Sequence, residues 1–264
     1  MNILESIILG IVQGLTEFLP VSSSGHIELG EAILNIHTGD NLLFSIVVHG
    51  ATALSTVVVY RKVIIDLIRG LLQFKNNKAT QYTLKILISM IPVSIVGILF
   101  EDKIETFFTG NVMLVGAMLI ITGLLLTFSY YAKKLVKDVS YDRALIIGIA
   151  QMIAILPGLS RSGLTISTAL VLGVSKEKAA RFSFLMVLPP IAGATFLQLK
   201  KFSESTSVTG SIGTTALIVG FIAAFLSGLA ACSWMVKIVK RGKLIYFAYY
   251  CFAIGIVSIV VSLL

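Results

Sequence analysis

The stretch QGLTEFLPVSSSGH, residues 13–26, interrupts an apolar segment that extends from residue 3 to residue 34. A second apolar segment, 144–173, is interrupted in the same way by PGLSRSGLT at residues 157–165. Proline, glycine and serine at these positions break a helix, and irregular backbone is tolerated at membrane depth only where protein or a water-filled cavity surrounds it. Each segment is therefore predicted to be a re-entrant hairpin of two short helices, not a transmembrane span.

The composition of the 264-residue chain is typical of an integral membrane protein. Hydrophobic residues make up 56% of the chain and charged residues 13%, whereas a soluble domain carries about 25% charged residues. A net charge of +8 would suggest nucleic-acid binding in a soluble protein, but the basic residues here lie in short loops between apolar runs. They therefore indicate membrane topology, and we expect membrane lipids and no nucleic acid as partners.

Six further apolar segments are long enough, or nearly so, to cross a bilayer, which takes roughly 20 helical residues. With the two hairpins they predict an all-α polytopic membrane protein that forms a single domain over residues 1–264. The two cysteines, Cys232 and Cys251, lie in separate apolar stretches and indicate neither a disulfide nor a metal site. The six predicted spans are 41–60, 83–100, 112–130, 182–199, 213–236 and 244–264.

The two interrupted segments resemble each other at a fixed offset of 138 residues. The matched pairs are Gln13 with Gln151, Ser22 with Ser160, Ser24 with Ser162, and Gly25 with Gly163. Each half of the chain, about 1–135 and about 140–264, then holds one hairpin followed by three spans. Because three is odd, the second half must enter the bilayer in the opposite sense, which is the pattern of an inverted-topology repeat with its site near the midplane.

The loop charges support this topology independently. Sixteen of the 21 basic residues lie in four segments, whereas the remaining loops, 101–111 and 200–212, together carry three lysines and four acidic residues. Since lysine and arginine mark cytoplasmic loops, the first hairpin is predicted to enter from the outer (periplasmic) face and the second from the cytoplasm, with their tips meeting inside the protein and the site open to the outer face. The four basic segments are 61–82, 131–143, 174–181 and 236–243.

Four polar side chains in the hairpins are candidates for function, because an ionisable group inside a membrane costs roughly 2.5–3.5 kcal/mol on insertion scales. Gln13 and Glu17 are four residues apart and share one face of a helix. Glu17 could equally extend to the interface, and His26 could be an interior histidine without a role. Arg161 cannot lose its charge, so it needs an anionic partner, which is either Glu17 or a ligand.

The serines favour a phosphate ligand. Ser22 and Ser160 each precede the second helix of a hairpin, which is an N-cap position. Both helix N-termini would then direct free N–H groups at one interior point, and such termini bind anions, phosphate above all. Arg161 adds a donor fork that suits phosphate oxygens. The alternative is that both serines only cap their helices.

The motifs QGLTEFLPVSSSGH and PGLSRSGLT resemble the two signatures of the undecaprenyl-diphosphate phosphatase family, also called the bacitracin-resistance protein family, and the likeness covers nearly the whole chain. Gln13 and Glu17 match the Gln form of the first signature, and residues 157–165 match the second throughout. The resemblance implies hydrolysis of the C55 polyprenyl diphosphate to its monophosphate and inorganic phosphate in the bacterial plasma (inner) membrane. It also implies recycling of the lipid carrier for peptidoglycan synthesis and bacitracin resistance.

These residues suggest a division of roles in that reaction. Ser23 is the candidate nucleophile, and His26 would relay the proton or protonate the leaving phosphate. Because a carboxylate repels a diphosphate, Glu17 and Gln13 are expected to hold a divalent cation, Mg²⁺ or Ca²⁺; Gln13 puts in doubt any scheme with two carboxylates. Arg161 would neutralise the charge of the terminal phosphate. The residues expected to bind that phosphate are Ser22, Ser160, Arg161, Ser162, Gly163 and Thr165.

Several alternatives remain open at this level. Inverted repeats with broken helices also occur in secondary transporters, so translocation of an anion or of the lipid carrier is the main rival to hydrolysis. A compact set of nucleophile, acid/base and arginine favours hydrolysis, since a carrier does not need it. The sequence does not decide between Ser23 and water as nucleophile, between a monomer and a homodimer, or whether His49 of the first span reaches the site.

Overall fold

The computed structural model describes residues 1–34, 42–100, 111–132, 136–204 and 213–263. Within these ranges all regular secondary structure is helical, apart from the isolated bridge between Lys137 and Val174. Five helices are long and apolar enough to cross a membrane, or six when one strongly bent pair counts as a span. The predicted all-α, multi-pass membrane class is therefore confirmed.

Both predicted interruptions are present, and each lies between two short helices. The first hairpin consists of α1 (Ile3–Thr16) and α2 (Ser23–Ile33), and the second of α8 (Tyr141–Ile153) and α9 (Arg161–Val171). In the turn of the second hairpin Gly158 has a φ of 85°. A Cβ atom at this position would lie 2.7 Å from the carbonyl oxygen of Val115, so both the left-handed backbone and the close approach to the neighbouring helix require glycine.

All six predicted spans correspond to long helices, with shifts at their ends. The helix that corresponds to the second predicted span begins at Lys78 and not at residue 83, because Asn77 caps it by accepting a hydrogen bond from the Thr80 N–H at 3.0 Å. The fourth predicted span begins at Lys176 and is interrupted once, after Met186. The helices that correspond to the predicted spans are α3 (Leu42–Val59), α5 (Lys78–Leu99), α7 (Val112–Tyr131), α10 (Lys176–Met186) followed by α11 (Leu188–Glu204), α12 (Thr214–Arg241) and α13 (Ile245–Leu263).

One helix is absent from the sequence-based prediction. Residues 61–82 were expected to form a basic loop, but α4 (Arg61–Leu71) is an amphipathic helix that is bent by 76° from α3. The charged residues of this segment lie in the connection between two predicted spans, as expected. Its apolar residues recur at helical spacing on the remaining surface, and this is the pattern that makes the segment helical.

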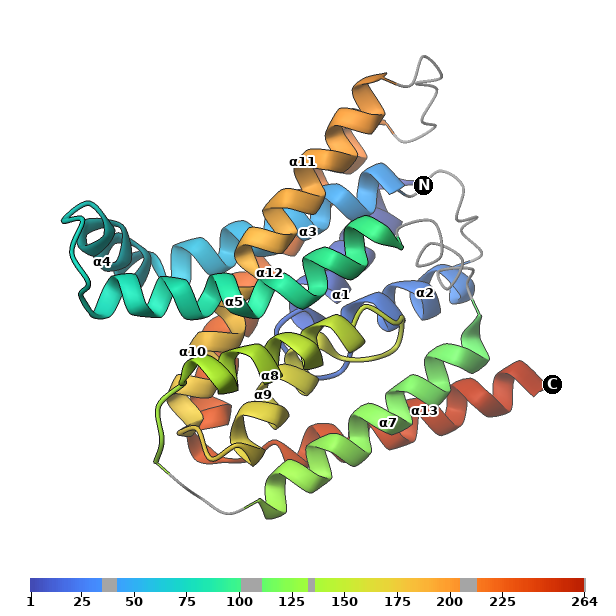
Figure 1. The fold of residues 1–264 in the computed structure, drawn as a ribbon. Helices are drawn as coiled ribbons and strands as arrows, with labels where there is room; N and C mark the ends of the chain where they lie inside the picture. The colour runs from blue at the N-terminus through green and yellow to red at the C-terminus, as the bar shows by residue number, and fades with distance from the viewer. Residues whose placement is uncertain (35–41, 101–110, 133–135, 205–212, 264) are drawn as a thin grey trace.

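The helices pair in a way that is consistent with the inverted repeat. In the first hairpin α1 packs along α12, and in the second α8 packs along α5, so the equivalent helices of the two halves exchange partners. The last helices of the halves, α7 and α13, pack against each other in opposite directions and are visible side by side in Figure 1. Their backbones meet at Gly116 and Gly255, where a Cβ on either residue would lie within 2.8 Å of the other's carbonyl oxygen. The inverted topology itself stays a prediction.

The two ends of the bundle differ in charge. Figure 1 shows both termini at one end, and α4 with the turn between α9 and α10 at the other. The described residues of the four basic segments belong to this second end; Lys133 and Lys134 lie outside the described residues, as do most residues of the loops 101–111 and 200–212. The loop before α8 is tied to α10 by an ion pair between Asp138 and Lys178. The Lys178 ammonium holds the pKa of the Asp138 carboxyl below its usual range.

Candidate active site

The two hairpin tips meet at an ion pair between Glu17 and Arg161. Glu17 follows the last residue of α1, and Arg161 is the first residue of α9. The Nη2 atom of Arg161 donates to Oε1 of Glu17, whose side chain is 6% exposed. Of the two partners considered for Arg161, the structure therefore supplies Glu17. The other terminal nitrogen of Arg161, Nη1, is buried and has no hydrogen-bond partner among the described residues, so it remains available to a ligand.

Three more polar side chains lie around the second carboxylate oxygen of Glu17, Oε2. Oε2 accepts hydrogen bonds from Ser23 Oγ at 2.8 Å and from Gln13 Nε2 at 3.0 Å. The Nε2 atom of His49 lies 4.0 Å from the same oxygen. Gln13 and Glu17 thus share a helix face as predicted, and α3 contributes His49, which the sequence left unassigned. Since Ser23 begins α2, its hydroxyl is held at a helix N-terminus.

Both predicted N-caps are confirmed, and their hydrogen bonds are of nearly the same length. Ser22 Oγ accepts from the Gly25 N–H at 3.2 Å, and Ser160 Oγ accepts from the Gly163 N–H at 3.1 Å. Ser22 has a φ of 70°, a backbone conformation that costs a non-glycine residue roughly 1–3 kcal/mol and tends to occur at functional sites. Each capping hydroxyl also lies 3.3 Å from the hydroxyl of the serine two residues later, Ser24 or Ser162.

The cap of α9 limits which backbone groups can bind a phosphate. The Ser160 N–H donates to Thr122 Oγ1 of α7 at 3.1 Å, and the Gly163 N–H is taken by the cap. The amides of Arg161 and Ser162 occupy the first helical positions, where N–H groups have no partner within the helix. They are therefore the donors that this N-terminus can offer, whereas Ser160 and Gly163 shape the loop.

Thr165 and Ser162 hold the second hairpin in place. Thr165 is fully buried, and its hydroxyl donates to the carbonyl oxygen of Arg161 at 2.8 Å and lies 2.6 Å from the Ser183 hydroxyl of α10. Ser162 Oγ donates across the tips to the carbonyl oxygen of Leu19 at 3.1 Å. Thr165 thus supports the backbone of Arg161.

His26 makes its hydrogen bonds away from Ser23. Its Nδ1 atom lies 2.8 Å from the carbonyl oxygen of Ser22, and its Nε2 atom lies 2.8 Å from the hydroxyl of Tyr250 on α13. A carbonyl oxygen only accepts, so Nδ1 carries the proton, and in the neutral ring Nε2 accepts from Tyr250. The two rings stack with their centroids 5.6 Å apart. Sequence reasoning missed Tyr250, because nothing distinguishes it from the other tyrosines of its apolar span.

Gln13 and Glu17 were predicted to hold a divalent cation. Among the described residues there is no group of three or more His, Cys, Asp or Glu side chains that could hold a metal ion. Gln13 Oε1 is nevertheless buried without a hydrogen-bond partner in this part of the chain. One carboxylate and one amide oxygen fit a cation such as Mg²⁺, which binds through one or two carboxylates, waters and substrate phosphates.

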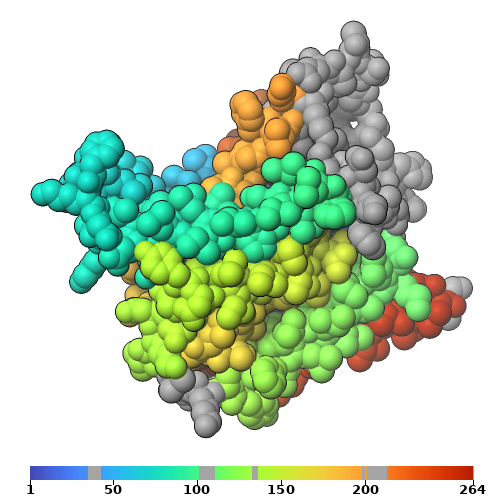
Figure 2. Space-filling view, in the orientation of Figure 1, coloured from blue at the N-terminus to red at the C-terminus, as the bar shows by residue number. Residues whose placement is uncertain are grey.

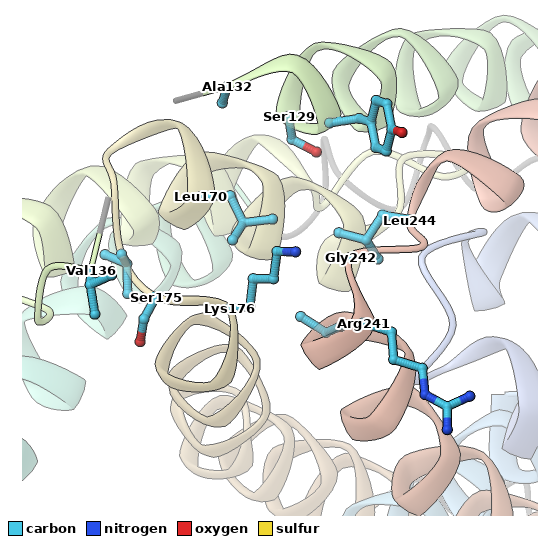
Figure 3. Close-up of a pocket in the computed structure, with 12 residues that line it drawn as sticks. Ser129, Ala132, Val136, Leu170, Ser175, Lys176, Arg241, Gly242 and Leu244 are labelled. Carbon is cyan, nitrogen blue, oxygen red and sulfur yellow. The ribbon is translucent and has the colours of Figure 1, made fainter. Parts of the chain in front are cut away.

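A cavity of about 520 Å³ lies elsewhere, between the ends of α7, α9 and α12. Figure 3 shows Lys176 directed toward Gly242 at its edge and the Arg241 side chain directed away from Lys176. None of the candidate site residues lines this cavity. It therefore adds nothing to the site between the hairpin tips.

Comparison with known proteins shows which family this chain resembles. Residues 6–257 match the family model described as bacitracin resistance protein BacA. A Bacteroides fragilis protein named undecaprenyl-diphosphatase is 55% identical over 98% of this chain and 97% of its own length. A protein of the same name from Parabacteroides distasonis is 54% identical over the full length of both chains. One from Methanococcus vannielii is 44% identical over 94% of this chain and 96% of its own.

The buried ion pair yields a prediction about stability. Arg161→Gln and Glu17→Gln should each lower the thermal unfolding midpoint in detergent, because each leaves one charge buried without its partner, at a cost of about 3–5 kcal/mol. The double variant carries neither charge and should recover most of the loss. Asp138→Asn with Lys178→Gln is the matched control, since this exposed pair should matter by less than about 1 kcal/mol. Losses that simply add in the Glu17/Arg161 double variant would contradict the pairing.

Proposed function

The chain belongs to the bacitracin resistance protein BacA family, and we propose that the paired hairpin tips are the site at which it hydrolyses undecaprenyl diphosphate. The reaction breaks the bond between the two phosphates and yields undecaprenyl phosphate and inorganic phosphate. The observation that carries this proposal is the contact of Arg161 with Glu17, which also accepts a hydrogen bond from Ser23. The Glu17 carboxylate thus contacts both the arginine that would bind the phosphate and the serine hydroxyl that would attack it.

Binding of the terminal phosphate uses groups that are unpartnered in the described part of the chain. The Nη1 atom of Arg161 is buried and free to donate, and the amides of Arg161 and Ser162 lie at the start of α9. An arginine fork and a helix N-terminus both stabilise the negative charge that spreads over the phosphate oxygens during transfer. The polyprenyl tail would lie along the apolar surfaces between spanning helices.

Ser23 is the proposed nucleophile and Glu17 its base. The Ser23 hydroxyl already donates to Glu17 at 2.8 Å, so its proton can move to the carboxylate as the oxygen attacks phosphorus. The new Oγ–P bond forms while the P–O bond to undecaprenyl phosphate breaks. Water then cleaves the phosphoserine, and inorganic phosphate leaves. In the alternative, Glu17 deprotonates a water that attacks the phosphorus directly.

His26 and Tyr250 act together in this proposal. The Ser22 carbonyl and the Tyr250 hydroxyl bind both ring nitrogens of His26 and fix its orientation at the start of α2. Because Nε2 carries no proton in the neutral ring, His26 first takes a proton there and then passes it to the leaving phosphate. Tyr250 is a positioning residue, because it acts through the histidine and not on the substrate.

A divalent cation completes the proposal. Gln13 Oε1 and the Glu17 carboxylate are the protein atoms that would hold it, and when bound it neutralises the repulsion between the carboxylate and the diphosphate. The spanning helices make this a multi-pass membrane protein. From the loop charges we place the site toward the outer face of the bacterial plasma membrane, where hydrolysis would return the lipid carrier to cell-wall synthesis and counter bacitracin.

The central residues can be tested with purified protein, undecaprenyl diphosphate, Mg²⁺ and a phosphate readout. Arg161→Ala and Ser23→Ala should each lower kcat/KM by about 100-fold or more, because each removes a group that acts in the transition state. Arg161→Lys keeps the charge without the fork and should still lose at least about tenfold. Thermal unfolding in detergent separates these losses from misfolding. Full activity of Arg161→Lys and Arg161→Ala would exclude the phosphate clamp, and full activity of Ser23→Ala would favour direct attack by water.

Tyr250→Phe tests the orientation of His26. Loss of one hydrogen bond should lower kcat by about 3- to 10-fold and leave KM unchanged. Tyr249→Phe, one residue along the same helix and 62% exposed, should leave both constants unchanged. An effect on KM alone, or an equal effect of the two substitutions, would show that Tyr250 does not act through His26.

The cation requirement is tested by chelation. EDTA should abolish phosphate release, and added Mg²⁺ or Ca²⁺ should restore it. Gln13→Glu should lower the Mg²⁺ concentration needed for half-maximal activity, because a carboxylate replaces an amide oxygen as ligand. Activity that survives exhaustive chelation would remove the cation from the proposal and leave Arg161 as the group that neutralises the phosphate.

A further inference from the structure

Helix α4 carries an apolar face that its own protein does not cover. Viewed along the helix, Ile68, Leu71 and Leu72 share one side, while Lys62 and Arg69 share another. The three apolar side chains are 51%, 37% and 66% exposed, respectively. An uncovered apolar stripe next to basic side chains is the pattern of a helix that lies in the surface plane of a membrane.

The position of α4 in the fold supplies the orientation that this requires. The helix joins α3 and α5 and is bent by 76° from α3, so it runs nearly parallel to the membrane surface when α3 crosses the membrane along its normal. Gly70 packs it against Ala79 at the start of α5. Figure 2 shows α4 extending from the body of the protein at one end of the bundle.

The basic residues in and after α4 favour an anionic lipid as its partner. Against the single acidic residue Asp66, the segment from residue 61 to residue 78 carries five basic residues. These groups can bind the phosphates of anionic headgroups while the apolar stripe enters the acyl boundary. The basic residues are Arg61, Lys62, Arg69, Lys75 and Lys78.

We propose that α4 is a membrane-surface helix that binds anionic phospholipid, with Ile68, Leu71 and Leu72 in the lipid and Lys62 and Arg69 on the headgroup phosphates. The turn after the helix extends this surface, because Phe74 is 91% exposed. The proposal does not depend on the chemistry assigned to the hairpin tips. It gives the basic end of the bundle a binding partner in addition to its role in topology.

Spin labels on the intact protein in nanodiscs test this assignment. The native Cys232 and Cys251 are fully buried, so Ile68→Cys can be labelled selectively, with Asp66→Cys on the polar side as the matched control. In nanodiscs that contain phosphatidylglycerol, the label at 68 should be at least threefold more accessible to oxygen than to a water-soluble nickel chelate. The label at 66 should show the opposite preference. Both variants should keep phosphate release, because α4 lies outside the catalytic groups.

The lipid charge is tested in the same samples. In nanodiscs of phosphatidylcholine alone, or with Lys62→Glu and Arg69→Glu in phosphatidylglycerol, the contrast between positions 68 and 66 should fall at least twofold. An unchanged contrast would overturn the preference for anionic lipid. Equal exposure of both labels to the nickel chelate would overturn membrane contact altogether. Dipolar broadening between labels at position 68 would show that a second copy of the chain, and not lipid, covers this face.

Discussion

A guanidinium that cannot lose its charge lies inside an apolar bundle, and the need to pair it is the constraint on which the rest of the structure depends. Arg161 meets this need through Glu17, a residue 144 positions earlier in the chain. Neither group could stay buried alone without a cost of several kcal/mol. The pair therefore forces the two hairpins, which belong to different halves of the chain, to bring their tips together.

The same pairing concentrates the chemistry. Once Glu17 is buried, its oxygens must be satisfied, and they gather donors from α1, α2 and α9, with His49 of α3 close by. A carboxylate held in this way orients both a serine hydroxyl and an arginine. The helix starts at Ser22 and Ser160 add partial positive charge at the same place. Structure and reactivity thus have a common origin, because the groups that neutralise Glu17 are those that would bind and attack a phosphate.

Packing around the tips keeps this arrangement rigid. Thr122 of α7 binds the amide of Ser160, and Ser183 of α10 binds the hydroxyl of Thr165. Glycines at the crossing of α7 and α13 let these helices approach to backbone contact, which brings Tyr250 within reach of His26. Each of these contacts joins segments far apart in the sequence. Substitutions in α7, α10 or α13 can therefore alter the site without touching a motif residue.

The sequence by itself determined the membrane class, the two interruptions, the six spans and the caps at Ser22 and Ser160, because these follow from hydrophobic length and from local backbone chemistry. It also identified Arg161 as a charge in need of a partner. Only the tertiary structure decided that the partner is Glu17, that Ser23 donates to Glu17 while His26 turns to Tyr250, and that residues 61–71 form a helix. The physical reason is range: caps and spans depend on neighbours within a few residues, whereas the pairing of buried polar groups depends on which helices pack together.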